Sequence, residues 1–291
     1  MDRLLSKVAR VLRSPLLPRR VTYHLWKWMC ARRSGEAFFF KVDLFGREYV
    51  YGGVCGFTDQ AVFGNLEGFE SETLIAVKKV LGATATGPAP AVLDVGSNNG
   101  QWLLLLKAIA PDAAVHCFEP FSELAEFIEA LGARNGFKQV WVNQMLVGES
   151  AGLGVLHFER GSSVTASTLA ALRPEFDSSR KVARTTVDDY VRDHAIDKVD
   201  LIKVDVELGE LEVLRGAVET LQRLRPYVVL EVLYTTYEGH LSKQRLMADL
   251  FHGLGYVPYH VGPDGLLTRR PDLAADPQYK FNNFLVAPAP I

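Results

Sequence analysis

From residue 91 onward, short apolar segments alternate with segments of helical periodicity, and this alternation restricts the fold more than any other feature of the chain. Parallel strands joined by helices are buried on both faces, so they appear in a sequence as continuous apolar runs. The pattern therefore predicts an α/β domain with a mostly parallel, doubly wound, Rossmann-like sheet. We expect strands at 91–95, 113–119, 138–146, 199–207, 227–234, 257–263 and 281–288, and helices at 101–110, 122–136, 208–224 and 242–255. An inserted β excursion around a polar loop is expected between 152 and 185.

The residues before this domain divide into two parts. Residues 1–33 combine apolar residues at helical spacing with nine Lys and Arg against one acid, Asp2, which predicts a basic amphipathic arm. Such an arm could contact an anionic membrane surface or a partner, or it could pack on the body with its basic face in water. Residues 34–88 hold a predicted β-hairpin around Phe45-Gly46 and a helix from about Ser71. We expect them to cover the cofactor site of the main domain, residues 89–291.

Cysteine usage, hydropathy and charge narrow the class of protein. Cys30, Cys55 and Cys117 are far apart and match no metal spacing, which favours free thiols in a reducing compartment. No apolar run reaches the roughly 18 residues that span a bilayer, and the N-terminus lacks a signal-peptide pattern. The expected location is the cytoplasm, with the arm allowing peripheral contact with the inner membrane surface. Beyond the arm, 33 acidic residues outnumber 23 basic ones, which argues against nucleic-acid binding by the body.

Ligands of doubly wound sheets bind beyond the carboxyl ends of the strands, so the residues that follow each predicted strand are the candidates. Acidic and amide side chains gather at these positions. The candidate cofactor-binding residues are Asp94, Gly96, Ser97, Asn98, Asn99 and Gly100 after the first strand, Glu119 and Pro120 after the second, and Gln144 and Met145 after the third. Asp205 and Glu207 follow the fourth strand, and Glu231 lies in the fifth.

The glycine loop at 94–100 distinguishes between two nucleotide-type ligands. A dinucleotide site needs the motif G-x-G-x-x-G so that the pyrophosphate can lie on a helix N-terminus. In this loop, asparagine occupies the position of the motif's middle glycine. Asp94 would also place a carboxylate beside the phosphates. S-adenosylmethionine has no phosphate, and its ammonium group is a suitable partner for Asp94. The alternative for Asp94 is a structural helix N-cap. Glu119 is placed to accept the ribose hydroxyls of either ligand.

The motifs DVGSNNG, CFEP, LIKVDVELGELEVLRGA and RPYVVLEV resemble those of the FkbM-type methyltransferases over about residues 60–290. The resemblance implies a class I methyltransferase fold, whose last strand is antiparallel, with S-adenosylmethionine as methyl donor and hydroxyl groups of sugars as common acceptors. Asp94, Gly96, Asn98, Gly100 and Glu119 match the family's cofactor-binding positions. The family's aspartate-x-glutamate-glycine motif is matched by Asp205, Val206 and Glu207, but Leu208 replaces the glycine, which comes one position later.

Asp205 and Glu207 are the predicted catalytic residues. If the strand continues through them, their side chains point to the same side, about 6.5–7 Å apart between α-carbons. They would then receive the acceptor hydroxyl or share a cation such as magnesium with it, and Lys203 would keep them ionised. The alternative is that they stabilise the N-terminus of the next helix. Glu231 and His240, the latter in a predicted polar loop, are further candidates for the general base.

These observations favour an S-adenosylmethionine-dependent methyltransferase that modifies a hydroxyl of a saccharide or similar metabolite. An NAD-dependent oxidoreductase is the second interpretation, and a non-catalytic cofactor-binding assembly partner is the third.

Overall fold

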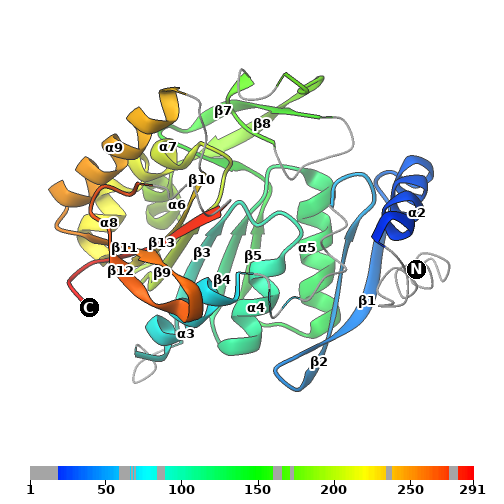
Figure 1. Cartoon of the computed structure of the whole chain (residues 1–291), viewed down its shortest axis with the longest axis horizontal. Helices are drawn as coiled ribbons and strands as arrows, with labels where there is room; N and C mark the ends of the chain where they lie inside the picture. Colours follow the sequence, from blue (N-terminus) through cyan, green and yellow to red (C-terminus); the bar gives the residue numbers. More distant parts are fainter. Residues whose placement is uncertain are drawn as a thin grey trace.

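The computed structural model describes residues 19–58, 66, 68, 70–83, 89–159, 166–170, 174–233, 238–274 and 281–291. The apolar repeat forms an eight-stranded sheet with the order β12-β11-β13-β10-β9-β3-β4-β5 (Figure 1). Its strands are β3 (Ala91–Val95), β4 (Ala114–Phe118), β5 (Val140–Asn143), β9 (Leu201–Val204), β10 (Tyr227–Leu233), β11 (Val257–Val261), β12 (Leu267–Arg269) and β13 (Phe281–Ala287). The strands β5, β4, β3, β9 and β10 pair in parallel, while β13 is antiparallel to both β10 and β11. The predicted fold class, a mostly parallel sheet with an antiparallel last strand, is confirmed.

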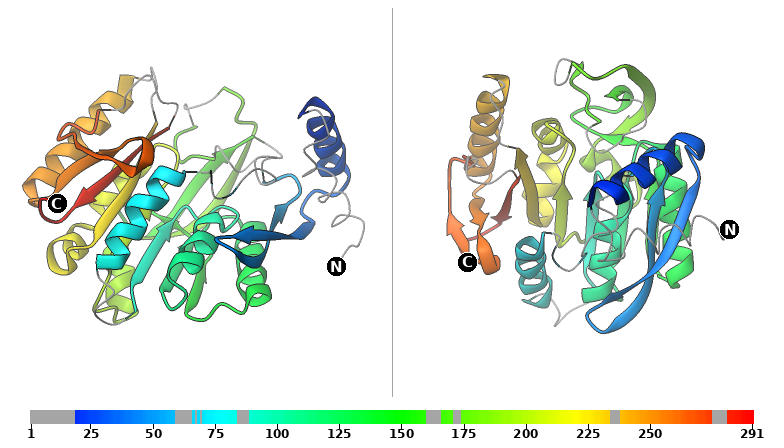
Figure 2. Two further views of the ribbon diagram at one scale, coloured as in Figure 1. Left: turned by 60° about the horizontal axis from the view of Figure 1, so that its bottom comes forward. Right: turned by 45° about the vertical axis from the view of Figure 1, so that its right-hand side comes forward.

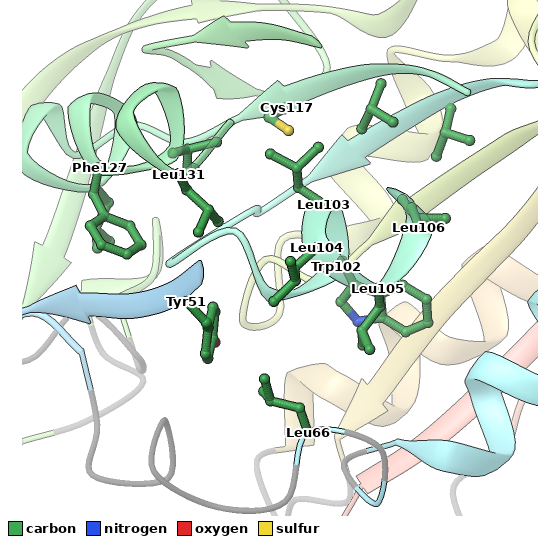
Figure 3. Packing of buried hydrophobic residues seen from close by; sticks show 14 of the residues in the cluster. Tyr51, Leu66, Trp102, Leu103, Leu104, Leu105, Leu106, Cys117, Phe127 and Leu131 are labelled. Carbon is green, nitrogen blue, oxygen red and sulfur yellow. The ribbon is translucent and has the colours of Figure 1, made fainter. Parts of the chain in front are cut away.

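Helices cover both faces of this sheet. The first face packs on α3 (Ser71–Ala83), α4 (Gln101–Ile109) and α5 (Ser122–Asn135), whose Leu, Val and Phe side chains share one core with Val92, Leu201 and Val229. Figure 3 shows part of this core, with Leu103 of α4 beside Cys117 of β4 and the Trp102 ring beside Leu105. The second face packs on α6 (Val187–Asp193), α7 (Glu210–Arg215), α8 (Val218–Leu224) and α9 (Glu238–Gly253).

The N-terminal segment adds a helix and a hairpin to the first face. After α2 (Arg19–Arg32), β1 (Ala37–Leu44) and β2 (Arg47–Val54) form an antiparallel pair. Phe45 and Gly46 both have positive φ, 53° and 75°, as the tight hairpin turn requires, so the predicted hairpin is confirmed. The hairpin lies along α5, on the opposite side of the molecule from β11–β13 (Figures 1 and 2). Asn135 of α5 exchanges two hydrogen bonds with the backbone of Val50, at 2.7 and 2.8 Å.

The inserted β excursion is a separate three-stranded sheet with the order β6-β8-β7. It consists of β6 (Leu146–Val147), β7 (Gly152–Phe158) and β8 (Ser178–Thr185). The strand predicted over 138–146 is therefore wrong in extent, because the chain leaves the main sheet after Asn143 and joins this second sheet at Leu146. Gln144 and Met145 form the bend between the two sheets.

Two other predicted boundaries differ. The helix predicted over 208–224 is divided into α7 and α8 at Gly216, where a Cβ atom would lie 2.1 Å from the carbonyl oxygen of Gly148. This close approach requires a glycine, and it ends the first helix. The helix predicted over 242–255 begins earlier, so His240 lies in α9 and not in a loop, although its side chain is outside the described residues.

The predicted amphipathic helix within residues 3–13 also lies outside the described residues. A 3-10 turn, η3 (Pro263–Gly265), links β11 to β12. In the described part of the chain, every helix is too short or too polar to cross a bilayer.

Candidate active site

The register of adjacent strands brings a row of mostly acidic residues to one edge of the sheet. This acidic row consists of Asp94, Asp205 and Glu231, with Lys203 among them. Asp94 of β3 lies beside Lys203 of β9, and Lys203 lies beside Val229 of β10. Alternate residues of a strand face the same side, so Asp205 and Glu231, each two residues further along, are on the face that α3 and α4 cover. Asp94, Lys203, Asp205 and Glu231 thus lie toward the carboxyl ends of parallel strands, where ligands of such sheets bind.

The glycine loop after β3 is a tight turn that two glycines make sterically feasible. Gly96 has a φ of 83°, and a Cβ atom there would lie 1.9 Å from the carbonyl oxygen of Asp205. Gly100 has a φ of 69° and is the N-cap residue of α4. The amides of Gly96 and Ser97 both donate to the carbonyl oxygen of Phe118, at 3.1 and 3.0 Å. The loop is thus held directly above the ends of β4 and β9.

Asp94 is completely buried at the base of this loop. Neither of its carboxylate oxygens has a hydrogen-bond donor among the described residues, and the Lys203 Nζ atom is 3.8 Å from Oδ1. Burial raises the pKa of Asp94, while the Lys203 charge acts to lower it. No side chain caps α4, so the N-cap alternative for Asp94 is wrong. A buried carboxylate with free acceptor capacity fits a ligand that carries an ammonium group.

Glu119 lies at the end of β4 with its carboxylate turned back toward the loop. Its Oε2 accepts a hydrogen bond from the amide of Asn98 and its Oε1 accepts one from the amide of Phe121, both at 2.9 Å. Burial raises the pKa of Glu119 to about 8, although these two amides favour the ionised form. Each oxygen has a second lone pair, which is available to a donor such as a ribose hydroxyl.

Asp205 is paired with Glu231 and with Lys203. Its Oδ2 lies 3.1 Å from the Lys203 Nζ atom, and its side chain is 29% exposed. Burial opposes ionisation of Asp205, but the Lys203 charge and the neighbouring Glu231 carboxyl outweigh it and lower the pKa of Asp205. Burial and the charge of Asp205 raise the pKa of Glu231 to about 11. The two carboxyl groups therefore titrate as a coupled pair, in which one shared proton is favoured.

The prediction that Asp205 and Glu207 project side by side from a strand is wrong. The strand β9 ends at Val204, and the backbone turns through Glu207 and Leu208, whose φ angles are 53° and 71°. Both are in the left-handed region, so Glu207 does not follow the alternation that places Asp205 over the sheet. The predicted contact of Lys203 with Asp205 is confirmed.

Neither Asp205 nor Glu207 caps the following helix. The amides of Val206 and Leu208 donate to Oε1 of Glu210, at 3.3 and 3.1 Å, so the first residue of α7 satisfies this turn. The turn also contacts the inserted sheet and its loop, because Ser167 Oγ donates to the carbonyl oxygen of Glu207 at 2.7 Å. Leu208 has the left-handed conformation that glycine would adopt without strain.

Four further cofactor candidates follow β3, β4 and β5. Ser97 Oγ donates to the carbonyl oxygen of Asp94 at 2.8 Å, which braces the turn. Pro120 is half-buried after Glu119, Gln144 is exposed, and Met145 is half-buried against the second core. Their contact with a cofactor stays a prediction.

Three residues near the site were missed by the sequence reasoning. Tyr51 of β2 is fully buried, and its hydroxyl accepts a hydrogen bond from Nδ2 of Asn99 at 2.7 Å. Asn283 of β13 lies opposite Glu231. Glu70, just before α3, interacts electrostatically with Lys203 and Asp205. Of the three, only Asn283 has a signal in the sequence, the polar pair NN inside an otherwise apolar strand. Tyr51 and Glu70 have none, because they reach the site through packing between segments far apart in the chain.

Within the described ranges, no group of three or more His, Cys, Asp or Glu side chains is arranged to hold a metal ion. The magnesium option for Asp205 and Glu207 therefore gains no support from these residues.

Comparison with known proteins identifies the family of the chain. The family model described as Methyltransferase FkbM domain matches residues 94–258, which is more than half of the chain and includes the loop, Glu119, Asp205 and Glu231. A relative, the 2-O-methyltransferase NoeI of Sinorhizobium fredii (strain NBRC 101917 / NGR234), is 24% identical over 196 residues, covering 62% of this chain and 79% of the relative.

Solved structures with a similar course of the chain were also found. Methyltransferase FkbM from Methylobacillus flagellatus KT aligns with a TM-score of 0.43 and 16% identity, covering 68% of this chain. This alignment covers 43% of the solved chain, so the present chain spans less than half of that protein's length. A fibrillarin of Aeropyrum pernix aligns with a TM-score of 0.44 and 10% identity, covering 86% of this chain and 82% of the fibrillarin. From the family match and the fold, this chain belongs to the FkbM family of S-adenosylmethionine-dependent methyltransferases.

Proposed function

We propose that this protein transfers a methyl group from S-adenosylmethionine to a hydroxyl of a saccharide or a related metabolite, as in the assembly of a modified glycan. The observation that carries the cofactor part is the fully buried carboxylate of Asp94, whose oxygens have no hydrogen-bond donor among the described residues and which lies under the glycine loop. When bound, S-adenosylmethionine supplies an activated methyl group. Its ammonium group suits Asp94, and its ribose hydroxyls suit Glu119.

The choice of oxygen as the acceptor atom is supported by two observations. The relative of known name is a 2-O-methyltransferase. Beside Asp94, the acidic pair Asp205–Glu231 offers an ionised carboxylate with 29% of its side chain exposed, which can accept a hydrogen bond from an incoming hydroxyl. Much of the acceleration would come from holding this hydroxyl in line with the methyl group.

The family match favours this function over the NAD-dependent oxidoreductase, since it places residues 94–258 in a methyltransferase family. The asparagine in the middle of the glycine loop agrees with that choice.

Incubation with methyl-labelled S-adenosylmethionine and a panel of saccharides tests the proposal. We expect label in a base-stable ether linkage on the saccharide. We expect Asp205→Asn to lower turnover about 10²-fold, because an oriented hydroxyl loses its charged acceptor, while calorimetry shows nearly unchanged cofactor affinity. The matched control is Asp197→Asn, which should behave as wild type. Asp197 is exposed and lies shortly before the N-terminal end of β9, at the opposite edge of the sheet from Asp205. Label on nitrogen, or no transfer by the wild type to any saccharide, would contradict the proposal.

A further inference from the structure

The start of α3 lies at the same edge of the sheet as the acidic row. The strand β11 is parallel to β10, since both are antiparallel to β13, so η3 after β11 is at the carboxyl edge. The first turn of α3 packs on η3: a Cβ atom on Gly265 would lie 2.6 Å from Cγ2 of Ile75 and 3.3 Å from the carbonyl oxygen of Glu72. Glu70, which immediately precedes α3, is thereby brought to the edge where Asp205 and Glu231 end their strands.

Glu70 is held in an unfavourable backbone conformation. Its φ is 48°, in the left-handed region, and its carbonyl oxygen accepts a hydrogen bond from the amide of Leu74 at 2.9 Å. A non-glycine residue keeps such a conformation only when the surrounding structure enforces it, and such residues are concentrated at functional sites.

The Glu70 carboxyl group interacts with charged groups at the ends of two neighbouring strands. They are Lys203 of β9, Asp205 directly after β9 and Glu231 of β10, while Trp102 of α4 and Glu72 of α3 also lie near it. Asp94 of β3 belongs to the same cluster through its interaction with Lys203. Four carboxyl groups thus surround one ammonium group, whose Nζ atom is 3.1 Å from Asp205 Oδ2, 3.8 Å from Asp94 Oδ1 and 6.0 Å from the centre of the Trp102 ring. A cluster with this excess of acid favours a cationic group in its midst, such as a sulfonium.

The four carboxyl groups differ in their capacity to accept a proton. Asp205 is ion-paired with Lys203, which lowers its pKa and makes it a weak base, and Glu231 is coupled to Asp205, whose charge raises the pKa of Glu231. Asp94 is fully buried below the loop. Burial raises the pKa of Glu70 to about 7, which Lys203 partly offsets and Asp205 reinforces. A helix N-terminus alone would act in the opposite direction. A base whose pKa is near the working pH is the most effective.

We infer that Glu70 is a catalytic residue of the methyl-transfer site, where it faces the sulfonium and takes the proton of the acceptor hydroxyl. The inference rests on the proposed function. In the step, the acceptor oxygen forms a bond to the methyl carbon, and the bond from that carbon to sulfur breaks with its electron pair left on sulfur. The hydroxyl proton passes to the Glu70 carboxylate, and Asp205 holds the hydroxyl in place. The base is therefore supplied by the segment before the sheet and not by a strand end.

The first test needs no acceptor. Calorimetry at pH 7 in two buffers of different ionisation enthalpy measures the protons released when the cofactor binds. A sulfonium lowers the pKa of a nearby carboxyl group, so about half a proton should leave Glu70. Wild type should release more protons with S-adenosylmethionine than with S-adenosylhomocysteine, whose sulfur is uncharged. Glu70→Gln should lose most of this difference and still bind both ligands. Glu72→Gln, two residues along the same turn, is the matched control and should keep it.

The second test uses turnover of the best saccharide of the panel. For wild type at saturating S-adenosylmethionine, kcat/KM for the saccharide should rise with pH and level off below about 7, because Glu70 must be ionised to accept the proton and the sulfonium lowers its pKa from about 7. Glu70→Gln should lower kcat about 10²-fold or more and lose this limb, while Glu70→Asp should recover part of the rate.

The two proposals fail in different ways. If wild type methylates no acceptor, the proposed function fails, and the calorimetric difference still decides whether Glu70 faces the sulfonium. If Glu70→Gln releases the same protons as wild type, or turns over normally with an unchanged pH profile, the role of Glu70 is overturned.

Discussion

Glu119 makes contacts that favour an ionised carboxylate even though the side chain is buried. Two backbone amides donate to it, and the raised pKa shows that burial outweighs them in the free protein. Ribose hydroxyls would add donors that favour the charged form. We expect Glu119→Ala to weaken S-adenosylmethionine binding by roughly 10- to 150-fold, because hydrogen bonds to a charged acceptor contribute about 1.5–3 kcal/mol. Titration calorimetry provides the measurement, with Glu126→Ala on the exposed side of α5 as control. Equal affinities for Glu119→Ala and wild type would remove Glu119 from the ribose site.

Leu208 illustrates a compromise between packing and backbone strain. It is 2% exposed, yet its φ of 71° costs an ordinary residue about 1–2 kcal/mol. Leu208→Ala should lose the buried side chain and keep the strain, whereas Leu208→Gly loses the side chain and relieves the strain. We therefore expect Leu208→Gly to be the more stable variant by about 1 kcal/mol, the reverse of the order within a helix.

Urea unfolding of the two Leu208 variants measures this difference. Gly82, a helical glycine of α3 with open space around its Cβ position, gives the comparison: Gly82→Ala should be at least as stable as wild type. If Leu208→Ala is the more stable of the two variants at position 208, the turn does not require a left-handed residue.

At the scale of elements, the hairpin β1–β2 is tied to the glycine loop by one buried hydrogen bond. Asn99 Nδ2 donates to the Tyr51 hydroxyl at 2.7 Å, and Figure 3 places Tyr51 in the same hydrophobic cluster as Leu104 of α4. Tyr51→Phe would leave the Asn99 amide without this acceptor in a buried position. We expect a loss of about 1–3 kcal/mol in the free energy of unfolding.

The same variant tests the proposal that residues 34–88 cover the cofactor site. Tyr51→Phe should also weaken S-adenosylmethionine binding in calorimetry, because the loop loses a contact that fixes Asn98 and Asn99. Tyr49→Phe, on the same strand beside Phe137, should change neither quantity appreciably. If Tyr51→Phe is destabilised and binds the cofactor as wild type does, the hairpin is only a structural support.

For the whole molecule, the basic arm remains a proposed contact with an anionic membrane surface. The part of it that the structure describes, α2, presents Trp28 with 54% of its surface exposed, and the Arg32 guanidinium lies 4.5 Å from the centre of this ring. An exposed tryptophan beside basic residues suits a membrane interface, where each cation contributes about 1 kcal/mol.

Sedimentation with anionic vesicles should therefore remove the protein from solution at low salt and remove less at physiological salt. Trp28→Ser should bind less, whereas Trp141→Ser, at a tryptophan of β5 with 44% exposure, should bind as wild type. Equal sedimentation of full-length protein and protein lacking residues 1–33 would show that the arm has another role.

Much of the fold can be predicted from the sequence, because the patterns that indicate strands, helices and tight turns are local. A parallel sheet needs apolar runs of strand length separated by helical periodicity, and residues 91–260 carry that pattern directly. Gly96 and Gly100 could be recognised because tight turns select glycine, and Glu119 because an acid directly after a buried strand has few structural uses. The alternation also identified the edge of the sheet at which a ligand would bind.

The arrangement of the proposed catalytic acids was decided by tertiary structure alone. Asp205 pairs with Glu231 because β9 and β10 are neighbours in register, while the turn at Glu207 and Leu208 separates the two acids that are adjacent in the sequence. Tyr51 and Glu70 come to the site from segments whose local patterns give no indication of it. Strand order and the packing of a distant hairpin and helix depend on contacts between residues far apart in the chain, and periodicity within a segment does not encode those contacts.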